Sequence, residues 1–290
     1  MAVAGQSPPA NPTVRALIEL ALSEDIGSGD ITSDLTLPKG ARAKAVMSPR
    51  EEGVAAGLGV AETVFAAVDP TITVTTTHAD GDPFAAGSSL MTVEGDARSV
   101  LTAERTALNF AQILSGIATL TATYVAAVRP LPVRVVDTRK TIPGWRTLSK
   151  YAVRMGGGLN HRFGLSDGVL IKDNHIAVVG SVGAAIAAAR AGAPHTMRIE
   201  VEVDTLDQLD QALEAGADIV LLDNMSLDEM REAVRRTDGR ALLEASGGVQ
   251  LDMLRGIAET GVDIISTRQI TVAAPPIDIG FDLVVESSDA

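Results

Sequence analysis

The second half of the chain alternates short apolar runs with longer amphipathic segments, and this rhythm restricts the fold more than any other feature. The apolar runs predict strands at 133–137, 169–172, 199–203, 219–222, 241–244 and 264–266. The segments between them predict helices at 183–191, 206–215, 227–236 and 251–259. Short buried strands that alternate with helices are typical of a parallel α/β fold. Six or seven such units favour a barrel over an open sheet.

Polar residues follow these predicted strands, at the point where each strand ends. They are residues 137–140, 172–174, Glu202 with Asp204, Asp223 with Asn224, Glu244 with 246–248, and 266–268. In a barrel of this kind the active site lies at the carboxyl ends of the strands. Six consecutive strand ends with polar or glycine-rich residues therefore predict one functional site at that edge.

The first 130 residues follow a different pattern. Strand-like runs at 41–47, 53–56, 72–77 and 89–93 are interrupted by one helical segment at 61–68. Helical spacing also predicts a helix at 13–26, which a turn at 28–32 separates from the first strand, and a long helix at 102–128 after the last of these strands. A chain of 290 residues can hold two domains, or one barrel with an appendage. Residues 1–12 are expected to form a loose tail.

Positive charge is concentrated in the middle of the chain. Residues 138–172 contain seven Lys or Arg and one acid, Asp167, whereas the whole chain has 24 basic and 37 acidic residues. Such a local cationic field suits the capture of a small, highly charged anion. Because Pro143, Gly144 and the glycines at 156–158 interrupt helices, we expect several of these cations on loops or strand ends. A solvated basic loop is the alternative for any single cation.

Composition excludes several other functions. A net charge of -13 and 3% aromatic residues argue against a nucleic-acid binder or a binder of anionic membranes. The chain has no cysteine, which excludes disulfides and thiolate metal sites. No uninterrupted apolar run reaches the roughly 18 to 20 residues of a membrane span, and the first residues do not read as a secretory signal. We therefore expect a cytoplasmic protein.

The four histidines stand singly, without the spacing of a transition-metal site. His161 lies inside the basic stretch and is expected to bind a ligand. His175 is expected to orient a loop, and His78 and His195 to lie on the surface.

The loops after the last two predicted strands, 246–248 and 266–268, are placed where barrels bind phosphate through backbone amides. Glu202 and Asp223 could hold sugar hydroxyls or a magnesium-bound phosphate. The alternative is that these two acids pair with Lys140 or Lys172.

Four motifs in the basic stretch, together with others along the chain, resemble the quinolinate phosphoribosyltransferase family. In the basic stretch they are Asp-Thr-Arg-Lys-Thr at 137–141, Lys-Tyr-Ala-Val at 150–153, Gly-Gly-Gly-Leu-Asn-His-Arg at 156–162 and Leu-Ile-Lys-Asp-Asn-His at 170–175. Upstream, residues 24–32, 50–53 and 104–109 are similar to the family's N-terminal domain. Downstream, residues 200–204, 222–224 and 244–248 continue the resemblance, which covers nearly the whole chain.

The resemblance implies a fold and a reaction. The fold would be an N-terminal α/β sandwich domain at 13–115 and an incomplete parallel α/β barrel at 116–276, with 277–290 packing back on the N-terminal domain. The enzyme would work as a homodimer and require Mg²⁺. It would convert quinolinate and phosphoribosyl pyrophosphate to nicotinate mononucleotide, pyrophosphate and carbon dioxide, a step of NAD biosynthesis.

The resemblance also assigns the site residues. The quinolinate carboxylates would be bound by Arg105, Thr138, Arg139, His161, Arg162 and Lys172. Of these, Arg105 would reach across from the partner subunit; an ordinary helical ion pair with Glu104 is its alternative. Phosphoribosyl pyrophosphate would be bound by Lys140, Glu202, Asp223, Ser246, Gly247, Gly248, Thr267 and Arg268. The catalytic residues would be Lys140, Lys172, Glu202 and Asp223, with Mg²⁺ held through Glu202, Asp223 or the substrate rather than by an assured protein ligand.

One loop departs from the family pattern. Where the family commonly has a small glycine followed by Thr-His-Ser, residues 266–273 read Ser-Thr-Arg-Gln-Ile-Thr-Val-Ala. Arg268 either binds the phosphate with its side chain or faces outward. Two other functions follow as alternatives, a related phosphoribosyltransferase acting on another aromatic acid such as nicotinate, and a non-catalytic anion-binding protein. The five cationic clamp residues favour a dicarboxylate over a monocarboxylate.

Overall fold

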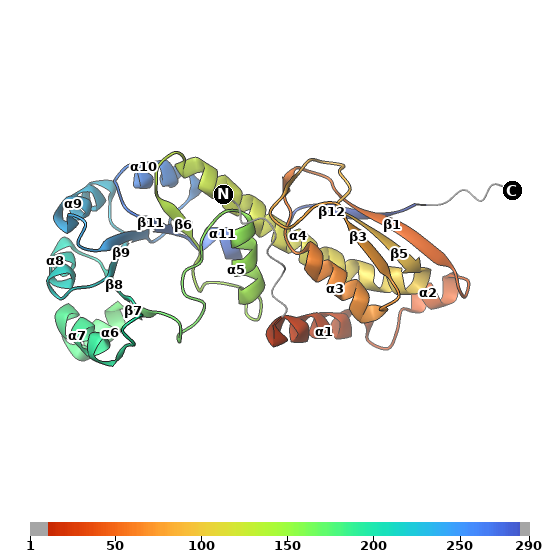
Figure 1. Cartoon of the computed structure of the whole chain (residues 1–290), viewed down its shortest axis with the longest axis horizontal. Helices are drawn as coiled ribbons and strands as arrows, with labels where there is room; N and C mark the ends of the chain where they lie inside the picture. Colours follow the sequence, from red (N-terminus) through yellow and green to blue (C-terminus); the bar gives the residue numbers. More distant parts are fainter. Residues whose placement is uncertain (1–10, 285–290) are drawn as a thin grey trace. The chain divides into compact units, whose positions relative to one another are not determined.

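The computed structural model describes residues 11–284, which form two compact units (Figure 1). Unit 1 contains the residues up to Ala122, Thr141–Gly157 and the residues from Thr271 on. Unit 2 contains Thr123–Lys140 and Gly158–Ile270. Most of the tail predicted at 1–12 lies outside the described residues, and Pro12 already begins the first helix.

Unit 1 is built on an antiparallel sheet with the strand order β12-β1-β5-β3. In β1 (Arg42–Pro49), buried residues such as Ala45 and Met47 alternate with more accessible ones, so one face of the sheet packs on a core. The other three strands are β3 (Thr73–Thr76), β5 (Met91–Asp96) and β12 (Ile279–Leu283). A separate two-stranded ribbon pairs β2 (Gly53–Val54) with β4 (Pro83–Phe84).

Six helices accompany these strands. They are α1 (Pro12–Ile26), α2 (Ile31–Thr36), α3 (Leu58–Val68), α4 (Ala97–Val128), α5 (Arg146–Met155) and α11 (Gln269–Val272), of which α4 and α11 run across the division between the units. Each of the first two begins with a side-chain cap, because Asn11 and Asp30 accept hydrogen bonds from backbone N–H groups at the helix start. Figure 1 shows α3 and α4 along one side of the antiparallel sheet.

By length and composition alone, α4 could cross a membrane. Half of its most apolar segment is buried inside the protein, however. Hydroxyl groups of α4 also form hydrogen bonds with the backbone of the segment before α3. Ser115 Oγ and Thr119 Oγ1 accept hydrogen bonds from the amides of Ala56 and Val54, at 3.1 and 2.9 Å. The apolar face of α4 is thus the core face of unit 1.

Unit 2 is a parallel sheet of six strands in the order β6-β11-β10-β9-β8-β7. The strands are β6 (Arg134–Val136), β7 (Val169–Ile171), β8 (Ile199–Val203), β9 (Ile219–Asp223), β10 (Leu242–Ser246) and β11 (Ile264–Ser266). Its helices are α6 (Asp173–Val179), α7 (Val182–Gly192), α8 (Leu206–Glu214), α9 (Leu227–Thr237) and α10 (Leu254–Ala258), the last preceded by the 3₁₀ turn η1 (Leu251–Met253). Among the described strands β6 and β7 do not pair, so the barrel is incomplete. The predicted fold class is confirmed.

The structure corrects part of the sequence interpretation. Residues 146–155, expected as part of a loop-rich basic stretch, form helix α5, and Lys150 is fully buried on it. The predicted turn at 28–32 leads directly into α2. The C-terminal strand β12 pairs with β1, from Ala45 opposite Leu283 to Pro49 opposite Ile279. The compact units differ from the predicted domains chiefly in residues 141–157, which lie within the predicted barrel domain but belong to unit 1.

Candidate active site

The carboxyl ends of the six parallel strands surround a cavity of about 520 Å³. This cavity, called the strand-end pocket below, lies wholly within unit 2. Every site residue predicted from the sequence lines it except Arg105, which lies on α4 in unit 1. These lining residues are Thr138, Arg139, Lys140, His161, Arg162, Lys172, Glu202, Asp223, Ser246, Gly247, Gly248, Thr267 and Arg268.

An ion pair joins two neighbouring strand ends. Lys172 follows β7, and its ammonium group contacts the carboxylate of Glu202 on the adjacent strand β8. The backbone N–H of Lys172 donates to His175 Nδ1 at 3.0 Å, which fixes the start of α6. The alternative in which an acid pairs with a site lysine therefore applies to Glu202, and His175 has the orienting role predicted for it.

The loop after β10 has a conformation that requires glycine. Gly247 has φ +91°, and a Cβ there would lie 2.3 Å from Asn224 Oδ1. Asn224 follows β9 and binds this loop, since its backbone N–H donates to the carbonyl of Ser246 at 3.1 Å. Its side-chain amide donates to Asp223 at 2.8 Å. Backbone amides of such a tight loop can approach an anion closely.

The buried side chain of Asp137 connects two parts of the basic stretch. Its carboxylate accepts hydrogen bonds from the backbone N–H of His161 at 2.9 Å and from Asn160 Nδ2 at 2.6 Å. The end of β6 is thereby tied to the segment that carries His161 and Arg162. In the segment that follows β6, Thr138 Oγ1 accepts a hydrogen bond from the backbone N–H of Lys140 at 3.0 Å.

Arg162 is held along one edge of its guanidinium group. Nη1 donates to the carbonyl of Gly168 at 3.0 Å, whereas the buried Nε has no hydrogen-bond partner in the described part of the chain. Burial and the neighbouring Arg139 lower the pKa of Arg162, but a guanidinium remains charged at neutral pH. As a cation on the wall of the strand-end pocket, Arg162 suits a carboxylate ligand.

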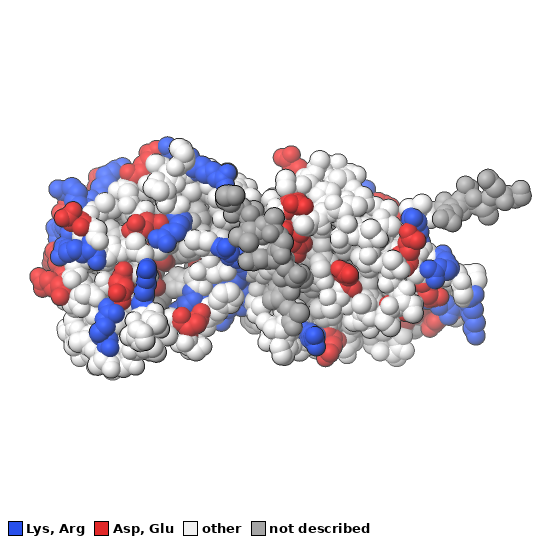
Figure 2. Space-filling view, viewed as in Figure 1, with Lys and Arg blue, Asp and Glu red and all other residues white. Residues whose placement is uncertain are grey.

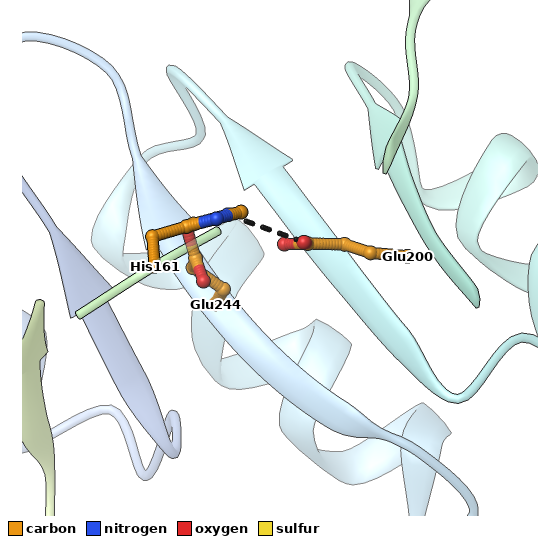
Figure 3. A group of neighbouring side chains, drawn as sticks. All are labelled: His161, Glu200 and Glu244. Carbon is orange, nitrogen blue, oxygen red and sulfur yellow. Dashed lines mark ion pairs between the residues drawn. The ribbon is translucent and has the colours of Figure 1, made fainter. Parts of the chain in front are cut away.

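The side chains of His161, Glu200 and Glu244 form a group next to Arg162. His161 Nε2 is 3.2 Å from Glu200 Oε2 and 3.8 Å from Glu244 Oε1. Figure 3 shows the imidazole of His161 and the carboxylate of Glu200 pointing toward one another, with Glu244 beside the ring. Both acids are almost inaccessible, with 5% of Glu200 and 3% of Glu244 exposed. Burial, with the neighbouring Glu200 carboxylate, raises the pKa of Glu244 to about 7.

The sequence interpretation did not include Glu200 or Glu244 among the site residues. The available signal was a carboxylate inside an apolar strand, as in Ile-Glu-Val-Glu-Val at 199–203, because a charged residue on a buried strand needs a partner. Glu244 was noted only as one of the polar residues at the strand ends.

The ligand atoms of this group lie within 4.8 Å of one another, as in a metal site. The imidazole argues against a metal. His161 Nδ1 accepts the backbone N–H of Arg162 at 2.6 Å, so Nε2 carries the proton and has no lone pair for an ion. On the pocket wall Asp223, whose partner Asn224 is neutral, is therefore the more suitable metal-binding acid, because Glu202 is paired with Lys172.

A second cavity of about 610 Å³ reaches the same group from within the barrel. Its wall includes Thr196, Met197 and Arg198, which precede β8, and Glu200 on that strand. His161, Arg162 and Glu244 line both cavities. The three-residue group therefore lies at the border between the barrel interior and the strand-end pocket.

Comparison with known proteins identifies the family. Residues 30–115 match the N-terminal domain, and residues 117–282 the C-terminal domain, of "Quinolinate phosphoribosyl transferase". The chain belongs to the quinolinate phosphoribosyltransferase family. The family resemblance predicted from the sequence motifs is confirmed.

Individual members of the quinolinate phosphoribosyltransferase family are similar over nearly their full length. The "Nicotinate-nucleotide pyrophosphorylase [carboxylating]" of Mycobacterium leprae is 47% identical over 275 residues, which cover 93% of this chain and 96% of that protein. A probable enzyme of the same name from Bacillus subtilis is 39% identical, with 94% of each chain covered. The crystal structure of NadC from Streptococcus pyogenes is 41% identical and superposes with a TM-score of 0.91 over 96% of this chain and 100% of that one.

The surface of unit 2 agrees with a localised site for a small anion. On the face shown in Figure 2, basic and acidic side chains of this unit are interspersed rather than gathered into a broad positive area. A nucleic acid would require a wider cationic footprint.

The loop that departs from the family pattern belongs to the pocket, because Thr267 and Arg268 line it. Thr267 Oγ1 also donates to the carbonyl of Val249 at 3.0 Å.

Proposed function

We propose that the protein transfers the phosphoribosyl group of phosphoribosyl pyrophosphate to quinolinate, with loss of carbon dioxide, to form nicotinate mononucleotide and pyrophosphate. One observation carries this proposal. The residues that would hold the dicarboxylate and those that would hold the phosphoribosyl donor line a single strand-end pocket. Family membership over both domains supports the same reaction.

The two substrates would occupy different sides of the pocket. Thr138, Arg139, Arg162 and Lys172 would bind quinolinate, whose two carboxylates match planar guanidinium donors. The His161 ring, whose two nitrogens contact Arg162 and Glu200, would line the same site. Lys140, Glu202 and Asp223 would bind phosphoribosyl pyrophosphate, together with the glycine-rich loop at 246–248 and the loop carrying Thr267 and Arg268. Arg268 would supply a side-chain cation to a phosphate where relatives commonly have a small residue.

The reaction needs no covalent bond to the protein. The pyridine nitrogen donates its electron pair to C1 of the ribose, while the bond from C1 to the pyrophosphate oxygen breaks and its electrons leave with pyrophosphate. The ring nitrogen then carries a positive charge. The bond between C2 and its carboxylate breaks next, its electron pair stays on C2, and C2 takes a proton from solvent as carbon dioxide departs.

Positioning and electrostatic stabilisation are the contributions of this chain. Lys140 would neutralise the negative charge that develops on pyrophosphate. Glu202 would hold Lys172 at the pocket wall through their ion pair, so that its ammonium is placed for a substrate carboxylate. Arg162, whose side chain lines the pocket, would bind the second carboxylate.

Magnesium fits the donor chemistry of the pocket. Carboxylate oxygens are preferred by this ion, which usually combines one or two of them with substrate phosphates. Glu202 is paired with Lys172, whereas Asp223 accepts a hydrogen bond from Asn224, a neutral partner. Asp223 is therefore the residue that would hold magnesium together with the pyrophosphate oxygens. When bound, the ion would neutralise charge on the leaving group.

The proposal includes a homodimer in which Arg105 completes the quinolinate site of the partner subunit. Arg105 has 59% of its side chain exposed and lies 3.9 Å from Glu104, so its guanidinium is accessible to a second molecule. We also place the enzyme in the cytoplasm, with which the cysteine-free composition is compatible.

The test is an assay of the purified protein with magnesium and phosphoribosyl pyrophosphate, to which quinolinate or nicotinate is added in parallel. We expect mononucleotide, pyrophosphate and carbon dioxide in equal amounts from quinolinate, and no product from nicotinate. Product from nicotinate alone would overturn the dicarboxylate assignment. The absence of product from both acids would contradict a catalytic function.

A further inference from the structure

We propose that Glu200 and Glu244 are positioning residues for His161, with Glu200 as the charged acceptor of its Nε2–H and Glu244 as a neutral carboxyl group. Together they would fix the tautomer and the orientation of the imidazole at the floor of the strand-end pocket. The consequence for quinolinate rests on the proposed function. The arrangement of the three side chains does not.

The tautomer of His161 follows from its two nitrogen atoms. Nδ1 lies 2.6 Å from the backbone N–H of Arg162, which makes Nδ1 an acceptor. The ring proton is therefore on Nε2, which lies 3.2 Å from Glu200 Oε2. An imidazole whose second nitrogen is bound in this way cannot rotate without losing both interactions.

The two acids differ because the ionisation of one makes the ionisation of the other unfavourable. They lie on β8 and β10, are both buried, and face the same imidazole edge. Glu200 Oε1 and Glu244 Oε1 have no hydrogen-bond partner in the described structure. Two adjacent carboxylates in a low-dielectric interior retain one proton between them.

The surrounding charges place that proton on Glu244. The charged and polar groups that act on Glu244 are Glu200, His161 and the hydroxyl of Ser266 on β11, and its own pKa is raised to about 7. Glu200 has a further positive neighbour, because the Arg162 guanidinium interacts with it electrostatically. The imidazole Nε2 is also closer to Glu200 than to Glu244, at 3.2 and 3.8 Å, so the charge on Glu200 is the better compensated and Glu244 is the neutral member.

This arrangement has a consequence for the charge of the pocket. Arg139, Arg162 and Lys172 must attract a dianion, and Glu202 already offsets one of these charges. If Glu244 also ionised, a second buried negative charge would lie beside the imidazole and repel the substrate. Quinolinate binding should then weaken as pH rises through the titration of Glu244.

The experiment compares Glu200→Gln and Glu244→Gln with wild type and with the exposed control Glu259→Gln. A Gln at 244 mimics the neutral carboxyl group, whereas a Gln at 200 removes the charged acceptor. At pH 6.5 we expect the KM for quinolinate to change less than about twofold in Glu244→Gln and to rise about tenfold in Glu200→Gln, the loss of one charge-assisted hydrogen bond. The KM for phosphoribosyl pyrophosphate should stay unchanged in both.

The pH dependence provides the second readout. Between pH 6 and 8.5 the KM of wild type for quinolinate should rise, and the KM of Glu244→Gln should rise less. Equal impairment of both variants, or identical pH profiles for wild type and Glu244→Gln, would overturn the assignment of the neutral member.

A third readout does not depend on turnover. Nitrogen NMR of histidine-labelled protein, with His161 assigned by comparison with His161→Gln, reports which ring nitrogen carries the proton. We expect a protonated Nε2 in wild type and in Glu244→Gln, and a mixed or altered tautomer in Glu200→Gln. A protonated Nδ1 in wild type would refute the positioning role, even if the protein did not act on quinolinate.

Discussion

The position of Arg162 on the wall of the strand-end pocket makes it the residue whose loss should affect quinolinate binding most directly. Its Nη1 is engaged by the carbonyl of Gly168, and its buried Nε is without a protein partner. We expect Arg162→Ala to weaken quinolinate binding about 100-fold, since a charge-assisted contact with a partly buried cation is lost. Calorimetric titration measures this directly. Arg231→Ala, which removes an exposed cation of α9, is the matched control. Unchanged affinity in Arg162→Ala would remove this residue from the site.

The raised pKa of Glu244 predicts how the stability of the protein depends on pH. In the unfolded chain a Glu has an ordinary pKa near 4.5, whereas in the folded protein the pKa of Glu244 is about 7. Unfolding therefore releases a proton between these values, and the free energy of unfolding should fall as pH rises across this window. Urea denaturation at pH 4.5, 6 and 7.5 checks the slope. The decline should be smaller in Glu244→Gln, and equal slopes would count against the shift.

At the scale of elements, Asp80 connects the start of one helix to the face of another. Its carboxylate accepts the backbone N–H groups of Gly57 and Leu58 at 2.9 and 3.0 Å, which caps α3. It also accepts the hydroxyl of Tyr151 on α5 at 2.7 Å. All of these groups belong to unit 1. The carboxylate thus satisfies three donors in a buried position.

We expect Asp80→Ala to destabilise the protein by about 3 kcal/mol, because it leaves buried donors unsatisfied. Tyr151→Phe removes only one partner of the same carboxylate and should cost about 1 kcal/mol. Denaturant midpoints of the two variants decide the ratio. A larger loss from Tyr151→Phe would mean that the hydroxyl, and not the helix cap, is the main interaction at this position.

The strands of unit 2 could be predicted because each is a short run of buried, mostly branched residues with a polar end. Helix α5 could not be predicted in the same way, since Pro143, Gly144 and the glycines at 156–158 surround it and suggested a loop. The strand-end rule placed the pocket residues together, including Lys172 and Glu202. The contacts of His161 with Glu200 and Glu244 could not be predicted, because they depend on the position of β8 relative to β10, with β9 between them.

At the scale of the whole molecule, the proposed exchange of Arg105 between subunits can be tested by complementation. Arg105→Ala and Lys140→Ala should each be inactive as homodimers. When they are co-expressed and form mixed dimers, one site of each mixed dimer combines an intact Arg105 with an intact Lys140. Random pairing then restores about a quarter of the wild-type sites. Activity that stays at background, in a preparation shown to contain mixed dimers, would place Arg105 outside the partner's site.

The strand order of unit 1 has a consequence for synthesis on the ribosome. Strand β1 lies between β5 and β12, and β12 is the last strand among residues 11–284. While the nascent chain emerges, β1 therefore keeps one unpaired edge until residues 279–283 have left the exit tunnel. Unit 2 lies between these two strands in the sequence and can finish its parallel sheet first. The unit whose first strands are translated first is thus completed last, and a chain cut short before residue 279 would leave one edge of β1 exposed to pairing with another chain.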